Sequence, residues 1–178
     1  MAPSSRGNLG VDMRKHWRPG LAVVAFAVLA AAAAGCSHAQ RDAQGKVTSA
    51  GSLSIFKLQV GDCFNNPKDV SKRIVAIADI PAVPCGEAHD QEVFAVLAHP
   101  AASGASFPGD EQILQFAEGR CLEQFETYVG KAYGDSGFDI VVVRPVQESW
   151  EKKDDRQVAC VLSAPGKRLT GSQKGTAA

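Results

Sequence analysis

The stretch DEQILQFAEGRCLEQFETYV, residues 110–129, decides the fold expected of this chain. Asp110 suits the first turn of a helix, and Gly130 directly after the stretch can end it. Apolar residues recur at steps of three or four and define one buried helical face: Leu114, Ala117, Cys121, Phe125 and Tyr128. The sequence therefore predicts one long helix that carries a cysteine on its buried side.

Shorter segments on both sides of this helix have the composition of strands. QEVFAVLAH (91–99) is apolar on both faces in its middle, as a central strand under a helix would be. Pro81 and Pro84 cannot donate to a ladder and are expected to end the strand before them. The expected strands are 53–60, 73–80, 91–99, 138–144 and 156–163. We expect QESWEKKDD (147–155) to be a loop or single turn. The order predicts an α+β fold, with a mainly antiparallel five-stranded sheet and one long helix packed on it.

An apolar run near the start of the chain indicates export. Fourteen apolar residues extend from Leu21 to Ala34 and end at Gly35-Cys36. A membrane-spanning helix needs about 20 such residues, so the run fits the core of a signal peptide better. The small residues before Cys36 resemble a lipobox, although Ala33 stands where leucine is commonest. We expect residues 1–35 to be a lipoprotein signal peptide and Cys36 to carry a lipid that holds the mature chain on the outer face of the cell membrane.

The ends of the chain leave two alternatives open. Cleavage at an ordinary signal site would release a secreted protein. The compact basic segment after Met13 makes Met13 a second candidate start beside Met1. Residues 36–52 are polar and are expected to form a flexible tether before an α+β domain over 53–165. Residues 166–178 have no apolar pattern, so a disordered tail is expected.

Charge and cysteine content narrow the class of protein. The segment 53–165 holds 10 Lys and Arg against 17 Asp and Glu, a net charge of −7, which disfavours a nucleic-acid partner. In an exported chain, the four cysteines other than Cys36 indicate two disulfides. Their spacings of 22, 36 and 39 residues contain no CxxC, which disfavours zinc and redox motifs. Of the three possible pairings we favour Cys63–Cys85 and Cys121–Cys160, which join neighbouring predicted elements, and we expect the first to be the more accessible.

Two polar or aromatic features are candidate sites. His89 could be a general base or metal ligand with Asp90 or Glu92, but His89 and Asp90 point to opposite faces of a strand, so a structural role is favoured. Trp150 could stack on a sugar or peptide, or cover an edge of the core. The chain has no G-x-S-x-G, no H-E-x-x-H and no phosphate-binding glycine loop. We therefore expect no catalytic residue, cofactor or metal.

A series of short motifs resembles the septum-formation-related domain of actinobacterial envelope proteins and lipoproteins. The motifs follow one another over residues 53–174: VGDCFN (60–65), VPCGEAHDQEVF (83–94), FETYVG (125–130) after Cys121, PVQESW (145–150), Asp155-Arg156 before Cys160, and LTGS (169–172). The resemblance implies an extracytoplasmic, disulfide-bonded domain without known catalysis, associated with septum formation. The matching positions are Gly61, Asp62, Cys63, Cys85, His89, Glu92, Cys121, Trp150, Arg156 and Cys160. Most of them read as fold determinants.

These observations lead to one preferred function and two alternatives. We expect a lipid-anchored, non-catalytic binding or scaffold module linked to septum formation or cell-envelope assembly. Its partners would be the membrane, through Cys36, and another envelope or division protein. The candidate binding residues are His89, Glu92, Trp150 and Arg156. The alternatives are a wall-directed hydrolase that uses His89 with Glu92 or Asp90, and a small-ligand receptor around Trp150.

Overall fold

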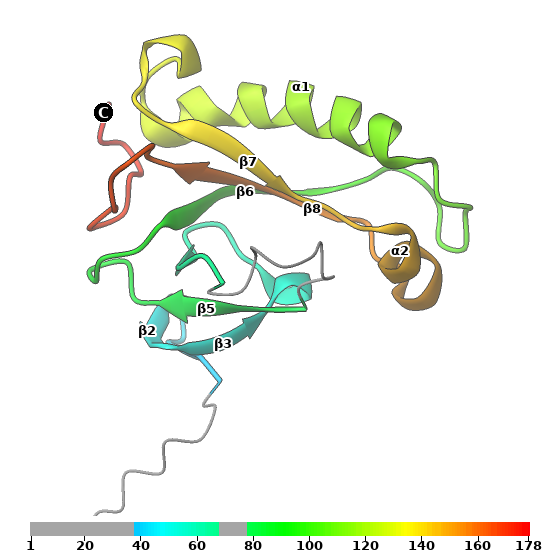
Figure 1. Ribbon diagram of the computed structural model, residues 1–178, viewed down its shortest axis with the longest axis horizontal. Helices are drawn as coiled ribbons and strands as arrows, with labels where there is room; N and C mark the ends of the chain where they lie inside the picture. Colours follow the sequence, from blue (N-terminus) through cyan, green and yellow to red (C-terminus); the bar gives the residue numbers. More distant parts are fainter. Residues whose placement is uncertain (1–37, 68–77) are drawn as a thin grey trace, which may run out of the picture. The chain divides into compact units, whose positions relative to one another are not determined.

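The computed structural model describes residues 38–67 and 78–178 (Figure 1). Its elements in chain order are β1 (Gln40–Arg41), β2 (Val47–Ser49), β3 (Gly51–Ser54), the 3-10 turn η1 (Ile55–Lys57), β4 (Cys63–Phe64), β5 (Asp79–Val83), β6 (Gln91–Ala98), α1 (Asp110–Val129), the 3-10 turn η2 (Tyr133–Asp135), β7 (Asp139–Val143), α2 (Gln147–Lys153) and β8 (Gln157–Ser163). No helix in these two ranges is long and apolar enough to cross a membrane. The expected lipidation site, Cys36, lies outside the described residues.

The main sheet has six antiparallel strands rather than the expected five. Their order is β3-β5-β4-β6-β8-β7, and β1 and β2 form a separate two-stranded sheet. The eight-residue strand β6 lies inside the sheet between β4 and β8, as its apolar sequence predicted. The α+β class and the antiparallel pairing are therefore confirmed, and the strand count is corrected.

Helix α1 covers one face of the strands β6, β7 and β8 (Figure 1). Its bounds agree with the prediction, and Gly130 ends it in the left-handed conformation with φ 85°. One residue of the predicted face is wrong: Ile113 is buried, whereas Leu114 is 37% exposed. Successive residues are about 100° apart on a helix, and the buried ladder steps by four from Ile113 through Ala117 to Cys121.

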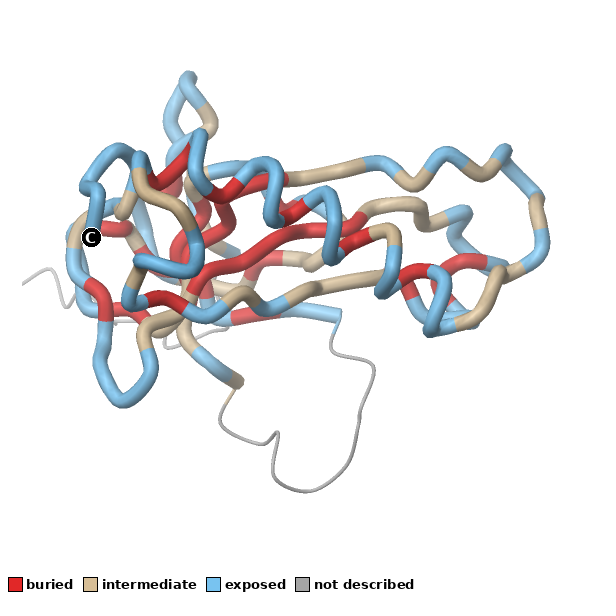
Figure 2. Tube along the Cα trace, turned by 90° about the horizontal axis from the view of Figure 1, so that it is seen from above, coloured by how far each residue is buried: buried red, intermediate tan, exposed pale blue. Residues whose placement is uncertain are grey.

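The sheet is buried on both faces. On the α1 side, Phe94 of β6 meets the ring of Phe125 edge-on at 5.5 Å between centroids. On the opposite side, Val93 packs in a second cluster with Phe64 and Ile80, which come from β4 and β5. Figure 2 shows the buried residues along the middle of the domain, with exposed residues on the turns and the outer face of α1. This double burial explains why β6 lacks the alternation of a surface strand.

The expectation of a flexible tether over 36–52 is wrong for its described part. The N–H of Ala39 donates to the carbonyl of Ser52 at 2.9 Å, and Val47 enters the second core cluster. The Arg41 guanidinium donates two hydrogen bonds, of 2.5 and 2.7 Å, to the buried carboxylate of Asp62. The polar composition concealed this order because only one side chain of the segment is large, apolar and buried.

The expected disordered tail is also part of the domain. Leu169 is buried, and its backbone exchanges hydrogen bonds of 3.0 and 2.8 Å with that of His89. Further along, the N–H of Gly175 donates to Tyr128 and the N–H of Ala177 to Val129 at the end of α1. Backbone pairing of this kind leaves no apolar periodicity in the sequence, so the segment looked unstructured.

Three further elements differ from expectation. The predicted strand 53–60 is wrong beyond Ser54, where β3 ends and the 3-10 turn η1 begins. Most of the predicted strand 73–80 lies outside the described residues, and β5 begins at Asp79 and continues through Pro81 instead of ending before it. Pro81 has no N–H to donate, but its carbonyl still accepts the N–H of Asn65 at 3.0 Å, so the residue keeps a backbone hydrogen bond within the sheet region. The segment expected to be a loop or single turn forms the helix α2, and Ser149 caps it by bonding Val146 at 3.1 Å.

Both predicted disulfides are confirmed. Cys63 pairs with Cys85 at a Cα–Cα distance of 5.2 Å, and Cys121 pairs with Cys160 at 5.5 Å. The second bridge joins α1 to β8 from inside the core. All four cysteines are buried, with only Cys85 measurably exposed, at 6%. Each bridge closes a loop long enough to stabilise the domain by roughly 3–4 kcal/mol.

We predict that removing the two disulfides has unequal effects. The C121A/C160A double variant should lose about 4 kcal/mol of unfolding free energy and C63A/C85A about 3, because the first closes the longer loop and attaches the only long helix of the described chain. Urea denaturation of both variants measures the difference. Mild reductant should open Cys63–Cys85 first, through the exposed edge of Cys85. Mapping that finds Cys121–Cys160 opened first would contradict this order.

Candidate functional site

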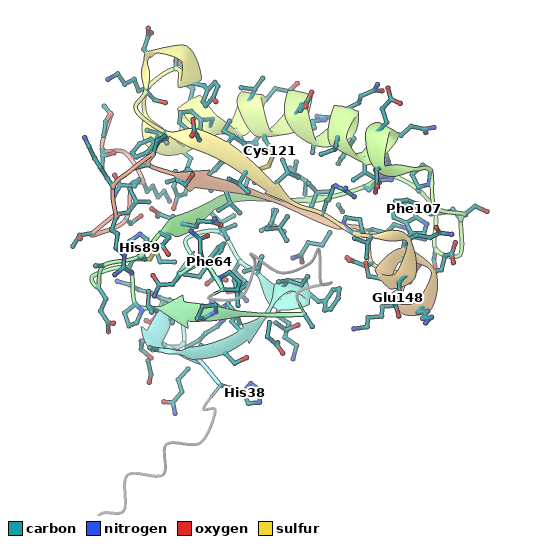
Figure 3. All side chains as sticks on the ribbon, viewed as in Figure 1. His38, Phe64, His89, Phe107, Cys121 and Glu148 are labelled. Atoms are coloured by element: carbon teal, nitrogen blue, oxygen red, sulfur yellow. A yellow bond between two sulfur atoms is a disulfide. The ribbon has the colours of Figure 1, made fainter. Side chains whose placement is uncertain are left out.

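An apolar groove of about 760 Å³ lies between α2 and the strands β4, β5 and β7. Its floor is formed by Ile55, Phe56, Phe64, Ile80, Val142 and Val143. Phe64 and Ile80 belong to the core cluster on the side of the sheet opposite α1, so the floor continues the core into the groove. Figure 3 labels Phe64 inside the domain and Glu148 on α2, which contribute to the floor and the rim.

The rim of the groove is basic. Among the described residues, three cations, Arg144, Lys152 and Lys153, and one anion, Glu148, line it. Lys152 pairs with Glu148 at 3.0 Å, and the ammonium of Lys153 lies 4.2 Å from the ring centroid of Phe56. Arg144 also pairs with Asp110 at 2.6 Å. The groove therefore combines an apolar floor with a net positive rim, in a domain whose central segment is net negative.

The predicted residue Glu92 lies elsewhere and is fully buried. Its carboxylate accepts hydrogen bonds from the Tyr128 hydroxyl at 2.7 Å, the Ser172 hydroxyl at 2.5 Å and the N–H of Gln173 at 2.7 Å. Burial, and then the hydrogen bond to Glu92, raise the pKa of Tyr128 well above its usual range. Glu92 thus joins β6 to α1 and to the C-terminal segment.

His89 is buried beside this segment and does not form the expected dyad. Its Nδ1 lies 2.8 Å from the carbonyl of Glu87, and its Nε2 is buried without a hydrogen-bond partner. Within residues 38–67 and 78–178, no hydrogen bond joins His89 to Glu92 or Asp90. Asp90 instead accepts from the N–H of Asn66 at 2.8 Å.

One group of metal-type ligand atoms lies nearby. The sulfur atoms of Cys63 and Cys85 and a carboxylate oxygen of Glu92 lie within 4.8 Å of one another. Both sulfurs are joined in the disulfide and cannot act as thiolate ligands. The group is therefore a packing contact between the bridge and the Glu92 cluster.

Trp150 and Arg156 form a second structural cluster. Trp150 is buried, and its indole N–H donates to the carbonyl of Ala105 at 2.6 Å. The Arg156 guanidinium stacks 3.7 Å from the ring centroid, and the rings of His99 and Phe107 approach Trp150 edge-on. These contacts occupy the ring that a ligand would stack on. Trp150 does not line the groove, although its neighbour Ser149 does.

The structure thus places all four candidate binding residues in the fold's interior contacts and offers a groove that sequence reasoning missed. Two signals were present: the uncharged run Val141–Val143 and the pair Lys152-Lys153. Neither indicated a groove alone, because the floor also needs Ile55, Phe64 and Ile80, which lie 59 or more residues before β7 in the sequence.

We predict that Glu92→Gln lowers the unfolding free energy by about 2 kcal/mol, because an amide cannot accept all three donors as the carboxylate does. Amide exchange at Gln173 should accelerate at the same time. Glu123→Gln, at a side chain that is 61% exposed on α1, is the matched control and should leave both readouts unchanged. Equal stability of the two variants would contradict a structural role for Glu92.

Comparison with known proteins identifies the family to which the chain belongs. No curated protein and no solved structure matches the chain. A family model described as septum formation matches residues 60–177. This range covers β4 through the C-terminal segment and so includes both disulfides, the Glu92 cluster and most of the groove. The chain therefore belongs to the septum-formation family.

Proposed function

We propose that this protein is a lipid-anchored, extracytoplasmic, non-catalytic binding module that acts in septum formation or cell-envelope assembly. The observation that carries the proposal is the apolar groove beside α2. Its volume of about 760 Å³ lies within the range of roughly 300–1,000 Å³ typical of binding sites. The floor residues Ile55, Phe56, Val142 and Val143 are only partly buried, and apolar surface left open in this way is often covered by a ligand or partner.

Two structural features support the outer face of the membrane as its location. Both disulfides are formed, as expected of proteins that fold in an oxidising compartment. The fold also begins close to the proposed lipid: His38 already pairs with Ser52, two residues after Cys36. Two extended residues span only about 7 Å, so the domain would lie directly at the bilayer surface.

The positions of the titratable groups support a binding role over the hydrolase alternative. Glu92 is surrounded by three donors from the protein itself, and His89 is buried against Leu169. Neither group faces the groove. The small-ligand alternative keeps one supporting observation, the size of the groove, but in that case Val142, Val143 and Phe56 would contact the ligand instead of Trp150.

We predict that Cys36→Ala abolishes anchoring. The variant should appear in the medium or remain uncleaved, and only the wild-type chain should take up a fatty-acid analogue in metabolic labelling. Ser37→Ala, one residue later, is the control and should stay labelled and membrane-bound. An unlabelled, freely soluble wild type would mean an ordinary secreted protein.

We predict that the groove contacts a partner protein in the cell. A photo-crosslinking amino acid in place of Val146, which is 37% exposed and lines the groove, should give one specific protein adduct in membranes. The same substitution at Val60, which is 52% exposed and outside the groove, is the control and should give none. Absence of an adduct at Val146, or the same adducts at both positions, would refute the binding role of the groove. An adduct to a small molecule alone would favour the receptor alternative.

A further inference from the structure

The two edge strands of the six-stranded sheet, β3 and β7, differ in whether a backbone segment pairs with their outer side. At the β3 edge, residues 38 and 39 cover the strand, because His38 bridges Ser52 and the N–H of Ala39 donates to it. At the other edge, β7 pairs with β8 alone over Asp139–Val143. Among the described residues, no further strand or backbone segment pairs with the outer side of β7.

The open edge has the properties of a strand that accepts another strand. Its register with β8 is continuous from Asp139 to Val143, with no bulge. Natural proteins usually protect such an edge with lysine, proline or a bulge. The middle of DIVVV has none of these, although the exposed Asp139 begins the strand and Arg144-Pro145 follows it, and Val141 leaves 37% of its surface exposed. Alternate N–H and C=O groups of β7 therefore remain available for pairing.

The edge and the groove are continuous. Val142, Val143 and Arg144 belong to β7 or follow it directly, and all three line the groove. A strand added along β7 would direct every second side chain to the face of the sheet on which Val143 packs, and Val143 lines the groove on that face. Backbone pairing and apolar side-chain burial could thus occur in one ligand, which is the mode of strand addition.

The charge of the groove rim indicates which kind of added strand would bind. The described residues of the groove rim include three cations and one anion. A second copy that paired through its own β7 would bring a second basic rim close to Lys152 and Lys153 and would be repelled, but a short acidic segment would be attracted to them. The observations therefore favour a peptide of a partner over self-association.

We propose that the groove binds an extended segment of a partner protein with alternating apolar and acidic residues, which adds as a new strand to β7. This inference rests on the proposed binding role of the groove and specifies its ligand. Backbone hydrogen bonds to β7 would give affinity, the floor would take the apolar side chains, and the two lysines of α2 would contact the carboxylates.

Binding of defined peptides to the full chain purified from membranes tests the proposal. The probe is a fluorescein-labelled octapeptide of alternating valine and glutamate, measured by fluorescence anisotropy. Two matched peptides carry lysine in place of glutamate, or N-methyl groups on the backbone nitrogens that would pair with β7. The first peptide should bind at least about tenfold more tightly than either of the others, because they lose charge complementarity or main-chain hydrogen bonds.

Variants and amide exchange locate the site. The K152E/K153E variant should reverse the preference, so that the lysine peptide binds more tightly than the glutamate peptide. R120E, at a side chain that is 60% exposed on α1, is the charge control and should leave the preference unchanged. On binding, alternate amides of β7 should exchange about tenfold more slowly, and those paired with β8 should not change.

Several outcomes would overturn the proposal. These are no binding of the glutamate peptide, equal binding of the N-methylated peptide, an unchanged preference in K152E/K153E, or protection of β7 that rises with protein concentration without peptide. The last result would identify a second copy as the occupant. If the crosslinker at Val146 captures a partner while the peptides fail, strand addition is wrong and the binding module stands. If both fail, the binding role of the groove is wrong as well.

Discussion

Three hydrogen bonds to the buried carboxylate of Glu92 are the constraint on which the rest of the domain depends. They come from α1, through Tyr128, and from the C-terminal segment, through Ser172 and Gln173. A buried carboxylate without partners would cost several kcal/mol, so the three donors must be in place whenever β6 is. The central strand, the long helix and the last residues of the chain therefore fold as one unit. The Cys63–Cys85 disulfide packs beside the Glu92 carboxylate.

Several polar residues of this chain serve the fold, whereas the floor of the groove is apolar. Asp62 binds Arg41, Glu92 binds three donors, and Arg156 covers Trp150. Figure 3 shows His89 near the C-terminal segment and Glu148 on α2 at the opposite side of the view. This separation allows the rim of the groove to vary in sequence without disturbing the hydrogen bonds that hold the domain together.

The two ends of the described chain stabilise the domain, whereas the outer edge of β7 is left without a backbone partner among the described residues. The first described residues cover β3, and the last ones bind α1, so both contribute to stability. Of the two edge strands of the six-stranded sheet, β7 is the one without a backbone partner on its outer side within the described parts of the chain. An exposed apolar edge favours aggregation, and its retention beside a basic rim is readily understood if a partner strand occupies it.

The sequence by itself determined the α+β class, the bounds of the long helix, the central position of β6 and the two disulfides. Helical periodicity and an even set of cysteines are local or countable signals, which do not depend on knowing the fold. The tertiary structure alone decided that the segments expected to be tether and tail are ordered, because their order comes from backbone pairing and single contacts such as Arg41 with Asp62. It alone also placed Glu92 and Trp150 in the interior and assembled the groove, because the groove needs side chains from η1, β4, β5, β7 and α2 that meet only when the sheet is formed.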